Sequence, residues 1–301
     1  VVIPANIVIT ILVLFMLFGG KNLGATAKKI TLQNEDGKEI ERIVPKNEFR
    51  QSIALFFFDN KSGDKKIDWL QYAVPFLLDL DINQDLFINT HIPYMSLQRV
   101  RSSGFKDGLN VPLPLKKKNA AHFHQKYFLA GTIGKDKQNY VIKIDIYETA
   151  TGQKKADRKV TGPDIFKLTD QLSYQVKLAL DIPERYIKKG TDLPVSEIST
   201  QSIPALKDFI AGINASVLGR DFKKGLEYID RAIEKDPAFA RAMVERMSLL
   251  NNSGQGEKAL AMLQKLMRLL YKLPERIQFV VKIQYYTFKK DLSKQIPIAK
   301  M

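Results

Sequence analysis

A short polar loop at residues 59–64, with the sequence DNKSGD, carries side chains that could bind a ligand. It directly follows the apolar run 53–58, and ligands favour the crevice at the carboxyl ends of strands. Asp, Asn, Ser and Gly also favour turns, so turn chemistry alone accounts for the loop, with Asp64 capping a following helix. We therefore predict a structural turn here. A small-ligand enzyme that uses Asp59 and Asp64 stays open as a third functional hypothesis.

Two further groups of side chains have types that could bind a metal or transfer a proton. Asp79, Asp81 and Asp85 form a row of carboxylates, which we expect to be solvated on a helix. The three histidines are His91, His122 and His124. The last two are two residues apart and would point to different sides of a helix. Zinc binding is therefore not predicted, and we expect these histidines on the surface.

No sequence motif for a familiar catalytic or cofactor site occurs in the chain. The phosphate-binding, dinucleotide-binding, metalloprotease and hydrolase-nucleophile patterns are all missing, as are the protein-kinase signatures. Cysteine is also absent, which excludes disulfides and thiolate metal sites. We therefore predict a chain that is not an enzyme and has no cofactor, metal or catalytic residue.

The composition is that of a folded protein with a basic surface. The net charge is +15 over 301 residues, yet the only tight basic run is Lys116–Lys118 beside a proline-rich loop. Neither an arginine-rich stripe nor aromatic residues interleaved with basic ones accompanies this charge. A nucleic-acid partner is therefore not expected.

Alternating and continuous apolar patterns predict a mixed α/β domain. The run 53–58 is apolar throughout, as in a strand buried on both faces. Further strands are predicted at 86–92, 127–133, 140–147 and 154–160, and helices at 67–82, 95–105, 115–124 and 164–180. Pro75 should bend the first of these helices or mark its start.

Several motifs in this region resemble the TolB amino-terminal-like domain. That family carries a buried strand followed by F-x-N-x-S-G-D, matched here by Phe58, Asn60, Ser62, Gly63 and Asp64. The strands at 127–133 and 144–152 resemble two later motifs of the same family. The resemblance covers residues 50–183 and implies an α/β fold with no catalytic role.

The first 49 residues suggest a membrane attachment. Val1–Phe18 is apolar and uncharged, just long enough to cross a bilayer, and a buried helix or a signal peptide are the alternatives. Residues 30–44 alternate around Asp36-Gly37, which predicts a β-hairpin linking the membrane to the domain. The resulting expectation is a single-pass protein of the bacterial inner membrane, with its soluble part extracytoplasmic.

A repeat follows a polar linker at 191–204. Gly225, Ile229 and Ala232 recur 34 positions later as similar residues, and 34 is the tetratricopeptide period. The pattern resembles that family, with about two and a half repeats over 205–301. Small residues are expected at Gly225 and Ala232 because two helices approach closely there.

In the tetratricopeptide family the first helices of each repeat line a groove that holds a protein or peptide. The resemblance places eight residues of this chain in that groove: Lys207, Ile210, Asn214, Val217, Arg241, Val244, Ser248 and Asn251. A polar groove face without a specific partner is the alternative.

These parts together predict five segments: a transmembrane helix (1–20), a hairpin and linker (21–49), a TolB-like domain (50–190), a linker (191–204) and repeats (205–301). TolB-like domains joined to such repeats occur in membrane-anchored bacterial serine/threonine kinases. The leading hypothesis is therefore the non-catalytic sensory or protein-interaction region of such a kinase. The alternative is an envelope-assembly scaffold without a signalling domain.

Overall fold

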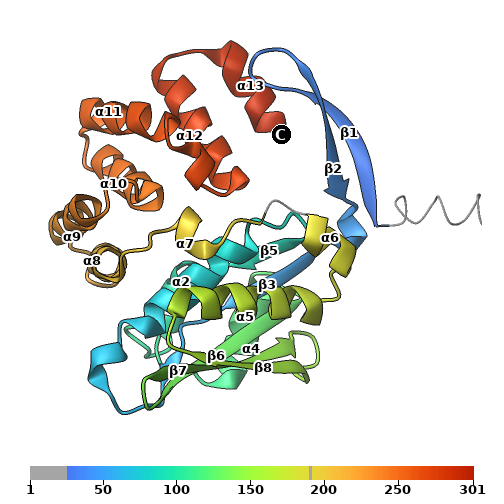
Figure 1. Cartoon of the computed structure of the whole chain (residues 1–301), viewed down its shortest axis with the longest axis vertical. Coiled ribbons are helices and arrows are strands. Elements are labelled where there is room, and N and C mark those ends of the chain that lie inside the picture. Colours follow the sequence, from blue (N-terminus) through green and yellow to red (C-terminus); the bar gives the residue numbers. More distant parts are fainter. Residues whose placement is uncertain (1–25, 190–191) are drawn as a thin grey trace, which may run out of the picture.

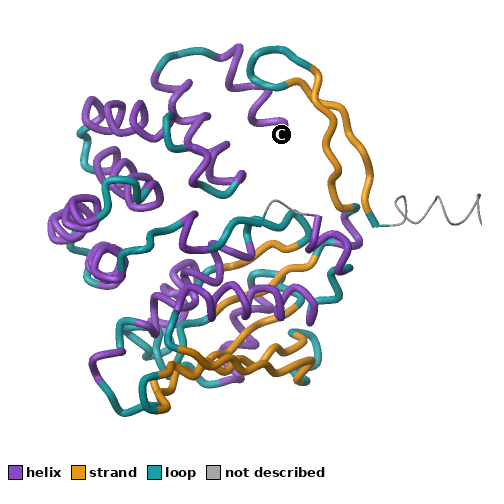
Figure 2. The backbone as a smooth tube through the Cα atoms, viewed as in Figure 1, coloured by secondary structure: helices purple, strands orange, loops and turns teal. Residues whose placement is uncertain are grey.

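The computed structural model describes residues 26–189 and 192–301. An α/β part occupies the lower half of Figure 1, and an arc of helices occupies the upper half. A long two-stranded hairpin stands beside both of them. Figure 2 shows that strands occur in the α/β part and the hairpin, whereas the upper arc consists of helices and loops.

The α/β part is built on a mixed six-stranded sheet in the order β5-β3-β6-β7-β8, with β4 pairing with β6. The strands β3, β4, β5 and β6 pair in parallel, and β6, β7 and β8 are antiparallel. Their bounds are β3 Gln51–Leu55, β4 Asp59–Asn60, β5 Ile88–His91, β6 Tyr127–Asp136, β7 Asn139–Glu148 and β8 Lys154–Gly162. The mixed sheet with helices agrees with the fold class expected from the sequence.

Helices cover both faces of the central strand β3. Ile53 and Leu55 belong to the large core under α2 and α5, whereas Ala54 and Phe56 pack with Ala120 of α4 on the opposite face. The prediction that both faces of this strand are buried is confirmed, because alternate side chains enter two separate cores. The helices are α2 Leu70–Ile82, α3 Pro93–Ser102, α4 Leu113–His122, α5 Ile165–Ala179, α6 Glu184–Lys189 and α7 Val195–Ile198.

Pro75 lies inside α2 and not at its start. A proline there leaves the carbonyl of Gln71, four residues earlier, without its helical partner. The backbone N–H of Phe58 donates to this carbonyl at 3.0 Å. The helix therefore continues through Pro75, because the segment after β3 supplies the missing hydrogen bond.

The hairpin predicted around Asp36-Gly37 is present, formed by β1 (Ala27–Gln33) and β2 (Glu39–Pro45). Gly37 has φ +76°, the left-handed conformation that favours glycine in such turns. The hairpin reaches the last helices of the chain. Its contacts there are ion pairs of Arg42 with Glu275 and of Glu35 with Lys282. The hydrogen bond from Lys282 and its charge hold the pKa of Glu35 below its usual range, although burial opposes them.

The upper arc consists of helices that pack against their neighbours in chain order. They are α8 Ile203–Ile213, α9 Phe222–Lys235, α10 Ala240–Asn252, α11 Gly256–Met267, α12 Glu275–Phe288 and α13 Leu292–Lys300. Short turns are η2 Asn47–Phe49, η3 Lys65–Ile67, the π-helical η4 Asn214–Leu218, and η5 Leu270–Lys272.

The close approach expected at Gly225 is present between α8 and α9. A Cβ atom at Gly225 would lie 1.9 Å from Ser216 Oγ and 3.1 Å from the Gly212 carbonyl oxygen. Ile229 and Ala232 of α9 are fully buried, and so are Leu263 and Leu266 at the positions 34 residues later in α11. The helical register deduced from the repeat is therefore confirmed.

The helical arc shares its core with the α/β part. Phe209 of α8 packs on Phe76 of α2 at 5.0 Å and on Phe239 at 4.9 Å. Arg276 of α12 donates to Asn83 Oδ1 at 3.1 Å and to the Ile88 carbonyl at 3.1 Å, at the two ends of the connection between α2 and β5. Apolar packing at one end and this arginine at the other join the two layers.

The prediction of a single-pass membrane protein requires correction. Within residues 26–189 and 192–301, no helix is both long enough and apolar enough to cross a membrane. The predicted anchor, Val1–Phe18, lies outside the described residues.

Candidate functional site

A cavity of about 590 Å³ opens where the hairpin, the α/β part and the helical arc meet. Its walls come from segments far apart in sequence, from β2, the α2–β5 loop, α5, α6 and the turn before α12. Its lining includes Asp85, Phe87, Lys177, Tyr186, Leu193 and Tyr271. The cavity therefore depends on the packing of all three parts.

A buried ion pair forms one wall of this cavity. Lys177 on α5 has a side chain only 2% exposed and pairs with Asp192. Asp81 of α2 lies next to this pair, and burial raises its pKa to about 7, although the charge of Lys177 opposes the shift. Lys177 is shared between two carboxylates and is therefore not free to act as a nucleophile.

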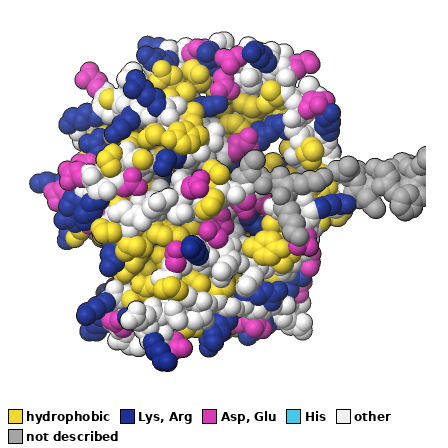
Figure 3. Space-filling view, in the orientation of Figure 1, with side chains coloured by type: hydrophobic (Ala, Val, Ile, Leu, Met, Phe, Trp, Pro, Cys, Tyr) yellow, Lys and Arg dark blue, Asp and Glu magenta, His cyan; other side chains and the backbone are white. Residues whose placement is uncertain are grey.

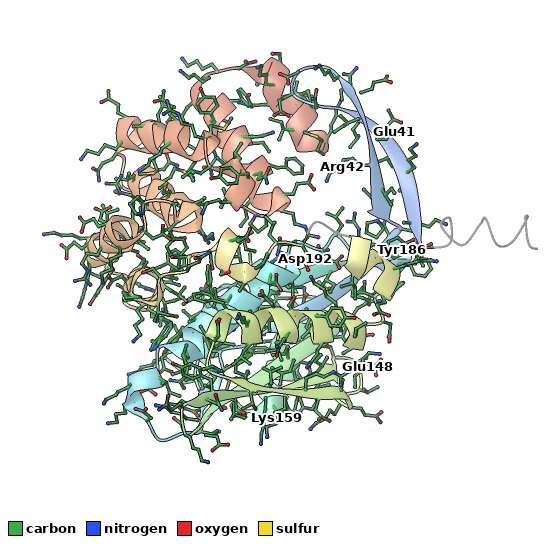
Figure 4. All side chains as sticks on the ribbon, in the orientation of Figure 1. Glu41, Arg42, Glu148, Lys159, Tyr186 and Asp192 are labelled. Atoms are coloured by element: carbon green, nitrogen blue, oxygen red, sulfur yellow. The ribbon has the colours of Figure 1, made fainter. Side chains whose placement is uncertain are left out.

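An aromatic wall faces the cavity from the hairpin side. Phe87 and Tyr186 lie with ring centroids 4.7 Å apart, and the Tyr186 hydroxyl is 2.9 Å from Thr26 Oγ1. Figure 4 places Tyr186 and Asp192 at the level where the two layers meet, with Arg42 above them on the side of the hairpin that faces the helices. The aromatic wall is thus fixed by packing and by a hydrogen bond.

The side-chain amide of Gln84 holds the segment that closes the cavity. Its Nε2 donates to the Leu193 carbonyl at 2.8 Å, and its Oε1 accepts from the Leu193 N–H at 3.0 Å. Gln84 thereby binds this backbone as a neighbouring strand would. Leu193 is kept in place while its side chain stays 37% exposed.

A second cavity of about 630 Å³ adjoins the first, and Leu193 and Tyr271 line both. Its other walls are mostly polar and come from residues 196–202, 235–236 and Lys272. We call the two cavities together the interlayer groove. In Figure 3, hydrophobic and acidic side chains gather across the middle of the visible face, where the layers meet. The groove is long, partly apolar and open, which suits an extended segment better than a compact small molecule.

The groove residues expected from the repeat resemblance lie elsewhere, and several contact the α/β part. Ile210 is buried in the shared core, Asn214 Oδ1 accepts from the Tyr94 hydroxyl at 2.8 Å, and the Val217 carbonyl accepts from Arg101. Lys207 Nζ lies 5.2 Å from the centroid of the Trp69 ring. The first half of the expected set thus faces the α/β part of the same chain.

The second half of the set lies on α10. Arg241 stacks near Phe76 and Phe209, at 5.6 and 5.8 Å, and pairs with Glu245 at 3.4 Å. Val244 and Ser248 are partly buried and Asn251 is exposed. None of the eight predicted residues lines the interlayer groove.

The polar atoms of the 59–64 loop bind one another. Asn60 Nδ2 donates to the Asp64 carbonyl at 3.0 Å and to Asp68 Oδ1 at 2.7 Å, and Asn60 Oδ1 accepts from the Ser62 N–H and hydroxyl. Asp64 accepts from the Lys66 N–H and caps η3. The prediction of a structural turn with a capping aspartate is confirmed.

The carboxylate row was predicted to be solvated, and this prediction is wrong. Asp79 accepts hydrogen bonds from Asn83 and Thr90, and burial raises its pKa to about 6 against the pull of Arg241 and Arg276. Asp85 is also desolvated, with a raised pKa. The helical arc covers this end of α2, which the sequence around it does not reveal.

His91 also departs from the expectation of a surface histidine. It is buried, its Nε2 lies 3.0 Å from Ser96 Oγ, and its ring stacks on Phe123 at 4.0 Å. Burial lowers its pKa, so the neutral ring is the stable form in the core. Among the described residues, no group of three or more potential ligands could hold a metal ion.

The basic run Lys116–Lys118 is not a uniform basic surface. Lys116 is buried with its ammonium 5.9 Å from the centroid of the Phe56 ring, and it forms no ion pair with a described residue. Lys117 donates to the Thr151 carbonyl at 3.1 Å, and Lys118 is exposed. Burial lowers the pKa of Lys116, with nearby Asp59 opposing the shift.

Replacing Lys116 by Met is expected to stabilise the protein by about 1 kcal/mol or more, because an apolar side chain of similar length avoids burying a charge. Since the pKa of Lys116 is lowered on folding, the wild type gains stability as pH rises from that lowered value toward about 10.4. The advantage of K116M should therefore be largest at neutral pH and shrink in alkali. Urea unfolding at pH 7 and pH 10 measures this, with the exposed Lys118→Met as control. An equal effect of both variants at pH 7 would contradict the burial of Lys116.

The sequence matches no protein-family model and no curated protein. Three solved structures resemble parts of the chain. The LpoB C-terminal domain from Salmonella enterica is 9% identical, covers 38% of this chain and 83% of its own, and has a TM-score of 0.28. TolB from Acinetobacter baumannii is 11% identical over 52% of this chain and 30% of its own, with a TM-score of 0.29. A lipoprotein from Neisseria meningitidis is 13% identical over 44% of this chain and 99% of its own, with a TM-score of 0.32.

A TolB structure is thus among the similar folds, in line with the motifs noted in the sequence. None of the three is named as a protein kinase or a repeat protein. All three TM-scores lie below 0.5, and the similarities therefore carry no argument about what this chain binds or does.

Proposed function

We propose that this chain is a non-catalytic scaffold that binds an extended segment of a partner protein in the interlayer groove. The observation that carries the proposal is the junction of two cavities at Leu193 and Tyr271, between the α/β part and the helical arc. Tyr271 is 66% exposed although it lines both cavities. An exposed tyrosine beside a groove is a common anchor in protein recognition, because it combines a large apolar ring with a hydroxyl.

The chemistry of the walls supports binding over catalysis. Lys177 is paired with Asp192, Glu275 is paired with Arg42, and Asp85 accepts from the Phe87 N–H at 2.8 Å. Ionisable groups that are paired in this way shape the walls, and they are not poised to take or give a proton. Apolar contact and hydrogen bonding to a peptide backbone are what remain available to a ligand.

Of the two functions considered from the sequence, the scaffold accounts better for this geometry than the kinase-linked sensory region. The hairpin, sheet and helices pack together to build one groove, and this assembly requires no attached signalling domain. We also propose that 205–301 are repeats of the tetratricopeptide type, supported by helices that pair in chain order and by buried positions that recur at 34 residues. An envelope location for the scaffold is part of the same proposal.

Selection of a phage-displayed random dodecapeptide library on the full chain tests the groove. A peptide bound there should lose about thirtyfold in affinity when Tyr271 is replaced by Ala, since an aromatic anchor contributes about 2 kcal/mol. Leu292→Ala is the matched control, because Leu292 is also 66% exposed but lies on α13. Selected peptides that bind wild type and Tyr271→Ala equally would refute the groove as the binding site.

A further inference from the structure

The last two helices carry exposed apolar side chains that the interlayer groove does not use. Leu292 and Ile296 of α13 are 66% and 55% exposed, and Val280 and Phe288 of α12 are also exposed. Single exposed apolar residues are ordinary, but four on one helix pair mark a candidate interaction surface. We call these four residues the α12–α13 surface.

The spacing of these residues places them in two parallel stripes. Val280 and Phe288 are eight residues apart, and Leu292 and Ile296 are four apart, so each pair shares one side of its helix. The two helices are antiparallel across a short turn, and Gln295 Nε2 donates to Thr287 Oγ1 at 3.1 Å. Two adjacent stripes of this kind form a shallow groove in which a third helix can lie.

Positive charge is concentrated in the same part of the chain. Residues 256–301 contain ten Lys or Arg and three Asp or Glu, a net charge of +7 out of +15 for the whole chain. Lys282 and Lys294 pair with the hairpin carboxylates Glu35 and Asp36. Lys289 and Lys290, at the turn between Phe288 and Leu292, are exposed and form no ion pair with a described residue.

We propose that the α12–α13 surface docks an acidic amphipathic helix of a partner protein. Earlier helices of the arc show how such a helix would bind. Leu226 and Ile233 of α9 reach into the core that is built mainly from α10 and α11. An incoming helix would continue this stacking, with its apolar face on the two stripes and its carboxylates near Lys289 and Lys290.

The test uses the full chain and an acetylated, amidated, fluorescent peptide of about 18 leucine and glutamate residues, patterned to be apolar on one helical face. Fluorescence anisotropy should show binding that weakens as salt is raised. The double variant Leu292→Gln/Ile296→Gln should lose about tenfold or more in affinity, and so should Lys289→Gln/Lys290→Gln. Met95→Gln is the control, because Met95 is similarly exposed but lies on α3.

Three outcomes would overturn the proposal. The first is equal or tighter binding of the same peptide with lysine in place of glutamate, or no binding at all. The second is binding of the full chain to vesicles of anionic lipid that both double variants abolish while peptide binding is unaffected. The third is a dimer in light scattering that Leu292→Gln/Ile296→Gln dissociates, since the surface would then be occupied by a second copy. Loss of groove binding in Tyr271→Ala leaves all these readouts unchanged, so the two proposals fail separately.

Discussion

Gly131→Ala is expected to lower the free energy of unfolding by about 1–3 kcal/mol, the usual cost of overpacking a core. Gly131 lies on β6 beneath Phe58, and a Cβ atom there would be 2.5 Å from three atoms of that ring. The ring is fully buried among the residues that pack under α2 and cannot move aside without displacing them. Phe58 also donates its backbone N–H to the carbonyl left free by Pro75, so a shift would disturb α2 as well.

Gly134→Ala provides the matched control in the same strand. A Cβ at Gly134 would lie 3.7 Å from its nearest neighbours in Val141, an ordinary van der Waals contact. Because alanine loses less backbone entropy than glycine on folding, this variant should be neutral or slightly stabilising. Chemical denaturation of both variants measures the difference. If the two free energies of unfolding agree within error, the close packing of Phe58 on Gly131 is wrong.

Gly225→Ala is expected to destabilise the chain, although the same change in an ordinary helix interior stabilises by about 1 kcal/mol. The reversal follows from Ser216, because the added Cβ would lie 1.9 Å from its hydroxyl oxygen. Ser216 is buried and donates to the Gly212 carbonyl at 2.9 Å, so rotating the hydroxyl away breaks a hydrogen bond. A larger residue, as in Gly225→Leu, should separate α8 from α9 and cost about 3 kcal/mol or more.

A double variant separates the clash with the hydroxyl from the remaining effects of the added methyl group. Ser216→Ala removes the oxygen that blocks the new Cβ, and Gly225→Ala should therefore cost less in the Ser216→Ala background than in wild type. Recovery should be incomplete, since Ser216 Cβ and the Gly212 oxygen would still lie 3.1 Å from the new methyl group. Thermal and urea unfolding of the four proteins give the coupling energy. Additive effects would show that the two helices are not in contact at this point.

Both glycines illustrate how far local sequence can lead. The 34-residue repeat alone places Gly225 at a close helix approach, because a buried position between two packed backbones has room only for a small residue. Gly131 belongs to a strand motif, and nothing in that motif names Phe58 as the ring lying over it. The chain segments that meet at Gly131 are more than 70 residues apart, so their contact depends on the order of strands in the sheet.

The carboxylate row shows the opposite case. Asp79, Asp81 and Asp85 have the composition of a solvated helix end, and local composition predicts exposure for them. Arg276 and Arg241 come from helices about 160 residues or more further along the chain and cover them in the folded state. A prediction from local sequence cannot contain that information, because the cost of burying an aspartate is offset by partners that are distant in the chain.

Local chemistry by itself determined the turn at 59–64, the hairpin at Asp36-Gly37, the doubly buried strand β3 and the small residues between α8 and α9. Each of these depends on side chains within a few residues or on a short repeat period, where propensity and spacing are sufficient. The interlayer groove, the burial of Asp81 beside Lys177 and the docking of the hairpin on α12 were decided only by tertiary structure. They arise where segments from opposite ends of the chain meet, and the sequence of any one segment does not specify which other segment will cover it.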